Sequence, residues 1–455
     1  MSKTIIGVSG LRGIVGQSLD PILASRYALA FARNLPAGKV LIGRDGRETG
    51  ELLARAVSSA LMAAGFKVLD AGVCATPTVG VLVRDLECSG GIQISASHNP
   101  AEYNGLKLFG SDGRVISATE GQSVLTTFGS NDFALVPFDQ VGEYVQVEDT
   151  LSGHLKRVLA TVNVEAIRAR NFKVLLDSNH GAGSLLAREL FESLNCDAKI
   201  IGGKPDGQFE HVPEPTVENL AEVAKAAGLF GADVVFCQDP DADRLAIIDG
   251  EGNYLGEEYT LAITLKHALA QASRHGFLGY SRKVVVNCAT SRMSLEIARE
   301  FGCECVVSAV GEANVTGTML SENAIYGGEG NGGPIDPRVG WVRDSFVGMA
   351  QTLDAMAARD GNVSRLASEI PPYCIVKSKI DLEEDCIAPV FECLETEFGS
   401  PSISRMDGLR IDFEDSWILV RASNTEPVVR VIAEATTRAI AQALLAKATD
   451  IIHKG

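Results

Sequence analysis

Short apolar runs alternate with longer segments of helical period along most of the chain. An apolar run near residues 39–43 is followed by a polar loop, a helical segment and a second apolar run. Apolar positions at Leu52, Ala56, Ala60 and Ala63 recur every three or four residues and predict the buried face of that helix. This alternation of strands and helices is typical of α/β domains.

The same order of elements returns twice, in "KVLLDSNHGAGSLLARELFESLNCDAKIIGG" and in "KVVVNCATSRMSLEIAREFGCECVVSAVG". Three such units predict three similar α/β domains. From Tyr373 onward the chain reads mostly as strands, with one helix near 384–398 and a closing helix, which indicates a smaller α+β domain. The expected domains are 1–150, 151–253, 254–369 and 370–455.

Length and composition limit the classes of function. A chain of 455 residues, with 46% hydrophobic and 22% charged residues, is typical of a multidomain globular protein. A formal net charge of -17 argues against nucleic acid or a membrane surface as a partner. The chain shows no signal-peptide pattern, no apolar run of membrane-spanning length and no CxxC pair, so we expect a cytoplasmic protein with free thiols.

The strongest local signal for chemistry is "DVVFCQDPDADRLAIIDG". A predicted buried strand at 233–237 delivers Asp239, Asp241 and Asp243 to a turn, and Arg244 follows. Three carboxylates so close together repel one another unless a cation neutralises them, and hard oxygen ligands suit Mg²⁺. A solvated acidic turn is the alternative, but the position at the end of a buried strand favours a metal site.

A second signal is "RASNTEPVVRV" at residues 421–431. Arg421 and Arg430 bracket a turn in which Ser423, Asn424 and Thr425 supply polar donors. Guanidinium groups and backbone N–H groups that converge in this way are typical of a phosphate pocket. The alternative is an ordinary loop between strands with two surface arginines.

The third signal is "ISASHNP", where Ser97 follows a predicted buried strand that the Asn-Pro pair ends. No GxSxG motif surrounds Ser97, so an esterase nucleophile is not indicated. Neighbouring side chains of a strand point to opposite faces, so we do not expect His98 to be a base for Ser97. A turn serine and a serine that carries phosphate, with Lys107 as a partner in proton transfer, both stay open.

Glycine-rich loops follow other apolar runs, around Arg12, around Arg44 and Arg47, and around Glu329 and Asn331. Such loops let a ligand approach the backbone, although for any single one an ordinary turn is the simpler interpretation. None matches a Walker loop or a dinucleotide fingerprint.

Taken in order, these motifs resemble the α-D-phosphohexomutase family over nearly the whole chain. "ISASHNP" with "YNGLK" is similar to the phosphoserine loop, "DPDADR" to the magnesium loop, "GEGNGG" to the sugar-binding loop and "RASNTEPVVRV" to the phosphate-binding loop. The resemblance implies three α/β domains with mixed sheets and a C-terminal α+β domain around a central cleft. It implies an isomerase that moves a phosphoryl group between the 1 and 6 positions of a hexose, through a phosphoserine and a hexose 1,6-bisphosphate, with Mg²⁺ as cofactor.

The resemblance also implies roles for individual residues. The catalytic residues would be Ser97, Lys107, Arg12 and His98. The metal ligands would be Ser97, Asp239, Asp241 and Asp243. Phosphate and sugar would be bound by Arg244, Glu329, Asn331, Arg421, Ser423, Asn424, Thr425 and Arg430. A small phosphosugar would be the partner, and the protein would be a monomer or a homodimer.

One loop departs from the family pattern. Many members carry Ser-Gly-His after the glutamate of the sugar loop, whereas Glu329 is followed here by Gly330, Asn331, Gly332 and Gly333. We expect glucosamine phosphate as substrate, with mannose phosphate or glucose phosphate as alternatives. A phosphatase that uses the same serine and metal, and a catalytically silent sugar-phosphate-binding protein, are the competing hypotheses.

Overall fold

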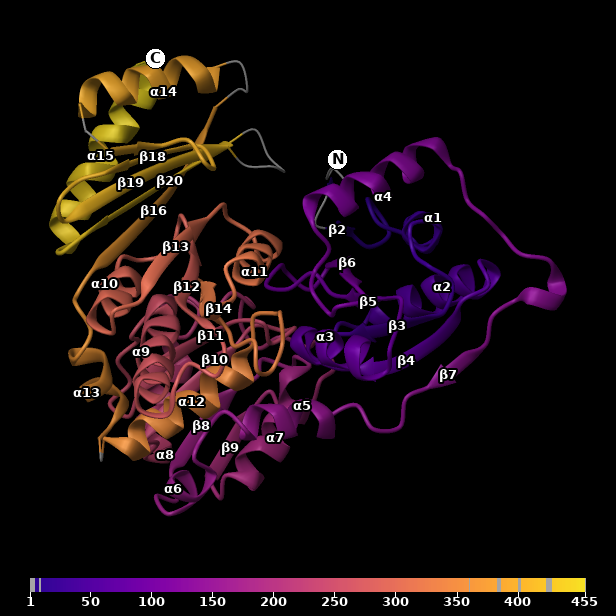
Figure 1. Cartoon of the computed structure of the whole chain (residues 1–455), viewed down its shortest axis with the longest axis horizontal. Coiled ribbons are helices and arrows are strands. Elements are labelled where there is room, and N and C mark those ends of the chain that lie inside the picture. Colours follow the sequence, from indigo (N-terminus) through magenta and orange to yellow (C-terminus); the bar gives the residue numbers. More distant parts are fainter. Residues whose placement is uncertain are drawn as a thin grey trace.

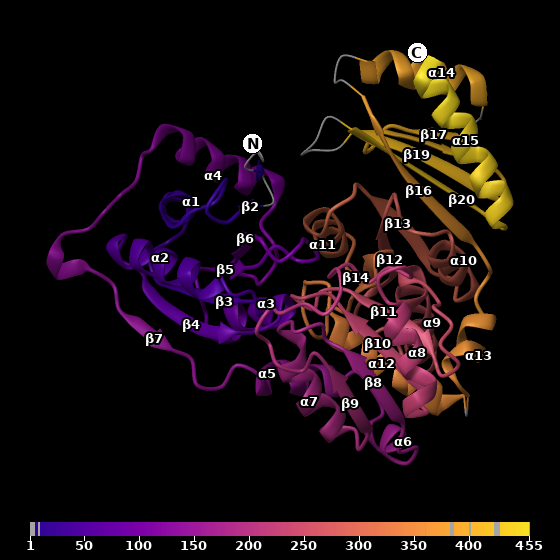
Figure 2. The same cartoon turned by 180° about the vertical axis from the view of Figure 1, so that it is seen from behind.

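The computed structural model describes residues 5–7, 10–359, 361–382, 386–399, 402–422 and 428–454. Its strands form four sheets, which follow one another along the chain (Figures 1 and 2). The first three sheets mix parallel and antiparallel pairs, and the fourth is antiparallel throughout. The predicted fold class is therefore confirmed.

The first sheet has the strand order β1-β2-β6-β5-β3-β4-β7. Its elements are β1 (Ile5–Gly7), β2 (Gly10–Ile14), α1 (Pro21–Arg33), β3 (Lys39–Arg44), α2 (Gly50–Ala63), β4 (Lys67–Val73), α3 (Thr76–Asp85), β5 (Gly90–Ile94), β6 (Tyr103–Gly110), α4 (Ala118–Ser130), the short 3₁₀ helix η1 (Phe138–Gln140) and β7 (Tyr144–Gln146). The predicted buried face of α2 is right at Ala60, which is buried, and wrong at Leu52. Leu53, Val57 and Leu61 are buried while Leu52 is 50% exposed, because this choice puts the larger side chains in the core.

The second sheet has the order β11-β10-β8-β9. Its elements are α5 (Ser152–Leu159), α6 (Val164–Arg168), β8 (Lys173–Asp177), α7 (Gly183–Ser193), β9 (Asp197–Ile201), α8 (Ala221–Phe230), β10 (Val234–Gln238) and β11 (Leu245–Asp249). Every residue of β10 and β11 is buried, and the two strands pair antiparallel. The turn between them is therefore fixed at both ends by the core.

The third sheet has the order β13-β12-β14-β15. Its elements are α9 (Glu257–His275), β12 (Ser281–Asn287), α10 (Met293–Glu300), β13 (Glu304–Ser308), α11 (Glu312–Ser321), β14 (Ala324–Glu329), β15 (Gly333–Ile335), α12 (Ser345–Ala358) and α13 (Val363–Ser368). The strands β12 and β14 run parallel, so their carboxyl ends, Asn287 and Glu329, come to the same edge of the sheet.

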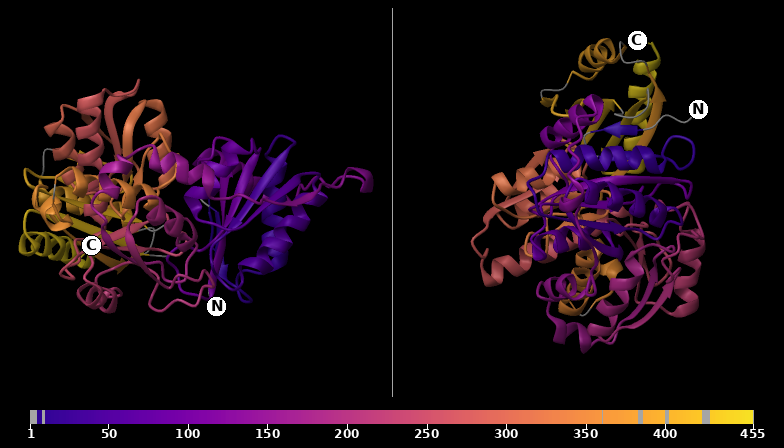
Figure 3. Two further views of the ribbon diagram at one scale, coloured as in Figure 1. Left: turned by 90° about the horizontal axis from the view of Figure 1, so that it is seen from below. Right: turned by 90° about the vertical axis from the view of Figure 1, so that its right-hand side faces the viewer.

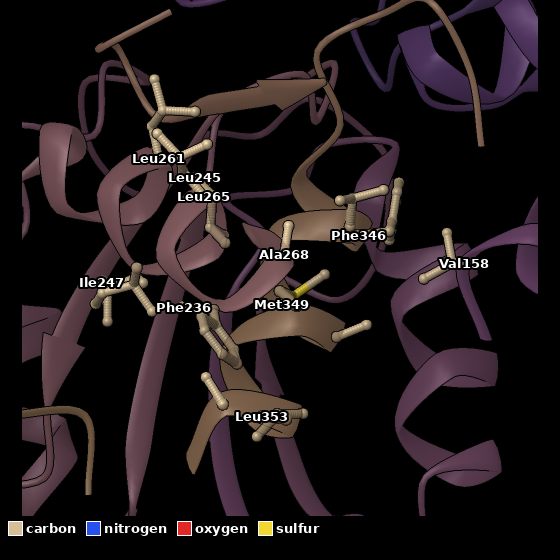
Figure 4. Close-up of a cluster of buried hydrophobic side chains, with 14 of the residues drawn as sticks. Val158, Phe236, Leu245, Ile247, Leu261, Leu265, Ala268, Phe346, Met349 and Leu353 are labelled. Atoms are coloured by element: carbon tan, nitrogen blue, oxygen red, sulfur yellow. The ribbon is translucent and has the colours of Figure 1, made fainter. Parts of the chain in front are cut away.

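The second and third sheets share one hydrophobic core. Helix α12 packs against α5, α6 and α7 as well as against α9. Figure 4 shows Phe346, Met349 and Leu353 of α12 beside Val158 of α5 and Phe236 of β10. The first sheet and the fourth sheet have cores of their own.

The fourth sheet has the order β16-β20-β19-β18-β17. Its elements are β16 (Cys374–Asp381), α14 (Ile387–Phe398), β17 (Ser402–Ser404), β18 (Leu409–Asp412), β19 (Ser416–Ala422), β20 (Val428–Ala435) and α15 (Arg438–Lys454). Helices α14 and α15 cover one face of the sheet. On the other face Trp417, Leu419 and Ile432 pack against Cys288 of the third sheet's region.

The chain forms two lobes when it is viewed from below (Figure 3, left). The first sheet with its helices makes one lobe, and the other three sheets make the second. None of the helices in the described part of the chain combines the length and the apolar character that crossing a bilayer requires.

Candidate active site

A cavity of about 720 Å³, called the cleft below, lies where segments of all four sheets meet. Eight of the predicted site residues line it: Arg12, His98, Lys107, Arg244, Glu329, Asn331, Arg421 and Arg430. Ser97 and the three aspartates are buried beside these lining residues. Ser423, Asn424 and Thr425 lie outside the described residues.

The acidic loop is the turn between β10 and β11. Asp239, Asp241 and Asp243 are fully buried, and one carboxylate oxygen of each lies within 4.8 Å of the others. Between them Ala242 has a φ of 57°, a left-handed conformation that an alanine rarely adopts. The turn is therefore held in an unfavourable shape that brings three carboxylates together.

Two cations on the protein already contact this loop. Lys107 Nζ lies 2.8 Å from Asp243 Oδ2 and 3.3 Å from Asp241 Oδ2. Arg343 donates to Asp243 Oδ2 at 2.6 Å and to Glu329 Oε2 at 2.8 Å. Burial opposes ionisation of Asp243, but Arg343 and Lys107 outweigh it and hold its pKa below the ordinary value.

Asp239 and Asp241 have fewer cationic partners than Asp243. Burial, and then the charges of Asp241 and Asp243, raise the pKa of Asp239 well above its ordinary value. Oδ1 of Asp241 and Oδ1 of Asp243 are buried and find no hydrogen-bond partner among the described residues. Unsatisfied buried carboxylate oxygens are costly, and a small hard cation would satisfy them. The donor set therefore fits Mg²⁺.

Ser97 contacts the acidic loop directly. Its hydroxyl donates to Asp239 Oδ2 at 2.7 Å, and its φ is 49°. Because strand β5 ends at Ile94, the backbone at Ser97 is no longer extended. The prediction that the Asn-Pro pair ends the strand is wrong, and so is the prediction that Ser97 and His98 point apart: Oγ and Nδ1 lie 3.3 Å from each other.

Arg47 holds the Ser97 loop in this shape. It is 3% exposed and donates to the carbonyl oxygens of Ser97 and Asn99, each at 2.6 Å, and to those of Pro100 and Tyr103. These bonds offset the strain at Ser97, because a buried guanidinium bound to several carbonyls fixes the loop.

Two further arginines lie above Ser97. Arg12 on β2 donates to Asn99 Oδ1 at 2.9 Å, and Arg244 lies 3.9 Å from Asp243 Oδ1. The charge of Arg244, then burial and the charge of Arg12, lower the pKa of His98 well below its ordinary value. This end of the cleft therefore presents cations and a neutral imidazole to a ligand.

The sugar loop begins at the carboxyl end of β14. The carboxylate of Glu329 accepts three hydrogen bonds: Oε1 accepts from Asn287 at 2.7 Å and from the Gly311 backbone N–H, and Oε2 accepts from Arg343. Asn331 lines the cleft, and its Oδ1 is buried without a partner among the described residues. Asn331 is thus the free polar group of this loop.

A row of three cations crosses the fourth sheet. The register pairs Lys379 on β16 with Arg430 on β20, and Arg430 with Arg421 on β19. All three line the cleft, and Asp407 pairs with Arg421. Like charges on directly opposite positions of a sheet destabilise it unless an anion lies over them. The row therefore places unmatched positive charge on the wall of the cleft.

Sequence profiles for one family match the chain in four consecutive parts. They are Phosphoglucomutase/phosphomannomutase, alpha/beta/alpha domain I at residues 3–135, domain II at 152–252, domain III at 257–373 and the C-terminal domain at 377–451. The chain belongs to the phosphoglucomutase/phosphomannomutase family. Members of this family are phosphohexomutases, so the chain is an enzyme of the isomerase class.

Relatives of the same length support this assignment. A "Phosphoglucomutase/phosphomannomutase" of Thermococcus kodakarensis is 34% identical over 438 residues, covering 95% of this chain and 94% of the relative. A "Probable phosphoglucosamine mutase" of Methanopyrus kandleri is 32% identical over 451 residues, covering 98% and 97%. A solved phosphoglucomutase/phosphomannomutase family protein of Burkholderia thailandensis superposes with a TM-score of 0.85 at 26% identity, covering 99% and 98%.

In this phosphohexomutase, the sequence patterns missed several residues of the cleft. They are Lys377, Lys379, Glu214, Glu257 and Glu258; Arg343 was missed as well, although it pairs with Asp243 and does not line the cleft. The spacing of Lys377 and Lys379 along a strand does predict that both face one way. Nothing near Arg343 in the sequence indicates that it reaches Asp243, one hundred residues earlier.

Proposed function

We propose that the chain interconverts hexose 6-phosphate and hexose 1-phosphate through a phosphorylated Ser97 and a bisphosphorylated sugar. One observation carries the proposal. A single cleft has a cationic end next to a buried serine, around Arg12, Lys107 and Arg244, and a second cationic end at the row on the fourth sheet. A hydrolase needs one phosphate site, whereas a mutase needs two.

At the first end, the phosphoryl group would sit on Ser97 Oγ. Asp239, Asp241 and Asp243, with an oxygen of that group, would hold Mg²⁺. When bound, the ion would neutralise charge on the transferred phosphoryl group. Arg12 and Arg244 would contact the remaining phosphoryl oxygens and keep the group in line with the sugar hydroxyl.

In the transfer step, the sugar hydroxyl oxygen forms a new bond to phosphorus and the bond between phosphorus and Ser97 Oγ breaks. The proton of the hydroxyl ends on Ser97 Oγ. Lys107 would relay it, giving one proton to Oγ and taking the other from the sugar. Although burial opposes its charge, Asp243 and Asp241 raise the pKa of Lys107, so it starts as an ammonium. His98 would orient Oγ from 3.3 Å.

At the second end, Lys379, Arg430 and Arg421 would bind the phosphate that is not reacting, with Ser423, Asn424 and Thr425 as the proposed donors of the adjoining loop. Glu329 and Asn331 would contact the sugar between the two ends. The bisphosphate must turn end for end and return its other phosphate to Ser97. Both ends must therefore accept a phosphate, which the two groups of cations provide.

We propose glucosamine phosphate as the preferred substrate, with hexose 1,6-bisphosphate as activator. The name of the Methanopyrus kandleri relative supports this choice, whereas that of the Thermococcus kodakarensis relative points to neutral hexoses.

The test compares the wild type with Ser97→Ala, using glucosamine 6-phosphate with Mg²⁺ and a catalytic amount of bisphosphate. We expect the wild type to form the 1-phosphate and to carry one phosphate by intact mass, and Ser97→Ala to lose both. Ser59→Ala, an exposed serine on α2, is the matched control. Full activity of Ser97→Ala, or release of inorganic phosphate without isomer, would contradict the proposal.

A further inference from the structure

We propose that Glu257 and Glu258 form a subsite for the free amino group of a 2-amino-2-deoxyhexose phosphate. This inference rests on the proposed function and names the residues that select the substrate class. Both glutamates line the cleft at the start of α9, on the wall that also holds Glu329, Gly330 and Asn331.

Glu257 and Glu258, like Glu214, line the cleft without an ion pair among the described residues, which sets them apart from Glu329. Among the described residues, neither makes an ion pair, whereas Asp243, Glu312 and Glu329 all pair with Arg343. Oε1 of Glu257 is closed off from solvent and receives no hydrogen bond in the described part of the chain. A buried carboxylate without a cation is costly and is favoured in its protonated form, so a cationic ligand would restore and balance its charge.

Acidic residues are common in the first turn of a helix, where they complement the helix dipole. Exposed side chains are sufficient for that role. Glu258 instead turns into the cleft wall, where Oε2 accepts from the Ser291 backbone N–H at 3.0 Å. The helix dipole therefore does not explain why both side chains face the cleft.

Gly330 gives an independent indication that the Glu258 carboxylate has a defined place. A Cβ atom at Gly330 would lie 2.1 Å from both carboxylate oxygens of Glu258. The φ of Gly330 lies outside the left-handed region, so a larger residue here would act on its surroundings by shifting the end of the Glu258 side chain, not by straining the backbone. The change in the sugar loop after Glu329 thus makes room for a carboxylate beside the sugar site.

The electrostatic environment agrees with this geometry. Burial raises the pKa of Glu257, and it raises that of Glu258 to about 8. Lys377 lines the cleft from β16, and of the charged groups it opposes this rise in pKa most strongly for both glutamates. Lys377 makes no ion pair with either glutamate in the described chain, so an ammonium on the ligand can take the place beside them.

The chemistry of the pair selects among hexose phosphates. A protonated amine at carbon 2 offers a charge and several N–H donors to two carboxylates. The hydroxyl of glucose or mannose offers no charge, and an N-acetyl group offers neither charge nor a small size. The subsite therefore favours the free amine over both.

The test measures kcat/KM for glucosamine 6-phosphate and for glucose 6-phosphate, and takes their ratio. We expect Glu258→Gln and Glu257→Gln each to lower this ratio by about 10- to 100-fold, as for a lost hydrogen bond to a charged group. Glu251→Gln removes an exposed carboxylate far from the cleft lining and should leave the ratio unchanged. Gly330→Ala should lower the ratio as well, because the new methyl group displaces the Glu258 carboxylate.

The outcomes separate this inference from the proposed function. A ratio that stays within about twofold of wild type in both glutamine variants would overturn the subsite, while mutase activity stands. A wild type that turns over no hexose phosphate would overturn the proposed function. The subsite would then be tested by calorimetry: equal Kd values for glucosamine 6-phosphate and glucose 6-phosphate would overturn it, and tighter binding of the amino sugar, lost in Glu258→Gln, would support it.

Discussion

The two ends of the cleft are built from the same kinds of charge but in opposite ways. At the acidic loop, Asp243 is paired with the buried Arg343 and with Lys107, whose side chain is 15% exposed. At the fourth sheet, Lys379, Arg430 and Arg421 stand side by side, and Asp407 pairs with Arg421. One end is assembled before any ligand arrives, whereas the other carries more positive than negative charge.

This difference separates the two tasks of the site. A preassembled, buried network positions reacting groups without reorganisation, which lowers the barrier to transfer. A row of cations without matching anions is stabilised when a phosphate binds, and it loses this stabilisation when the phosphate leaves. This would suit the proposed reorientation of the bisphosphate in the cleft. Substitutions at the first end should therefore act on stability and kcat, and those at the second end on KM.

Of the substitutions at the acidic loop, removal of Arg343 should lower the stability of the protein most. Arg343→Met leaves Glu329 buried without its cation and Asp243 with Lys107 alone, and we expect the free energy of unfolding to fall by about 3–5 kcal/mol. Urea denaturation measures this directly. Arg55→Met, which breaks an exposed pair with Glu51, should change stability by less than about 0.5 kcal/mol. A similar small loss for Arg343→Met would show that the network is not preassembled.

Removing one carboxylate tests whether this end acts on the chemical step. Asp241→Asn takes one charge from the proposed metal ligands, and we expect kcat to fall by about 100- to 1,000-fold with little change in KM. Steady-state kinetics over a range of Mg²⁺ concentrations gives both constants. Asp197→Asn, on the exposed start of β9, is the control. A rise in KM at constant kcat would reverse the assignment of the two ends.

The second end should respond to Lys379→Gln with a higher KM. We expect an increase of about tenfold at nearly constant kcat, because one charge-assisted contact to the non-reacting phosphate is lost. The effect should shrink at high salt, since the row faces solvent. Lys199→Gln, on the exposed strand β9, should leave KM unchanged. A loss of kcat without a change in KM would argue that the row takes part in the transfer step.

The smallest expected effect concerns Glu258, whose carboxyl group has no ion-pair partner among the described residues. Burial raises the pKa of Glu258 to about 8. The charge of Lys377 lowers this pKa, and the charges of Glu434 and Glu257 raise it further. The folded state therefore keeps a proton that the unfolded state has lost, and stability falls as pH rises from the ordinary pKa through about 8. The Tm of Glu258→Gln should exceed that of wild type increasingly between about pH 5 and pH 9. A pH-independent difference in Tm, as expected for Glu251→Gln, would contradict the shift.

The sequence predicted those parts of the site that are local in the chain. Asp239, Asp241 and Asp243 lie within one turn after an apolar strand, so their spacing alone indicated a metal site. Lys379 belongs to the same row of cations as Arg430, but only the register of β16 with β20 brings them together. Arg343 reaches Asp243 through tertiary packing that no local pattern records.

Two errors have a local physical cause. The expected separation of Ser97 and His98 assumed an extended backbone, and the positive φ of Ser97 turns both side chains to one side. The predicted face of α2 counted apolar residues without their size, whereas the core selected Leu53, Val57 and Leu61. Periodicity predicted the fold class correctly, because strands and helices alternate along much of the first three sheets.

The position of α12 has a consequence for how this protein can exchange parts with its relatives. The helix follows the third sheet in the chain, yet Phe346, Met349 and Leu353 complete the core over the second. A chimaera joined near residue 254 would combine half of this core with half of another, and its packing would be mismatched. The second and third sheets would therefore have to be exchanged together, and a replacement of the fourth sheet, which has a core of its own, would still have to keep its contact with Cys288.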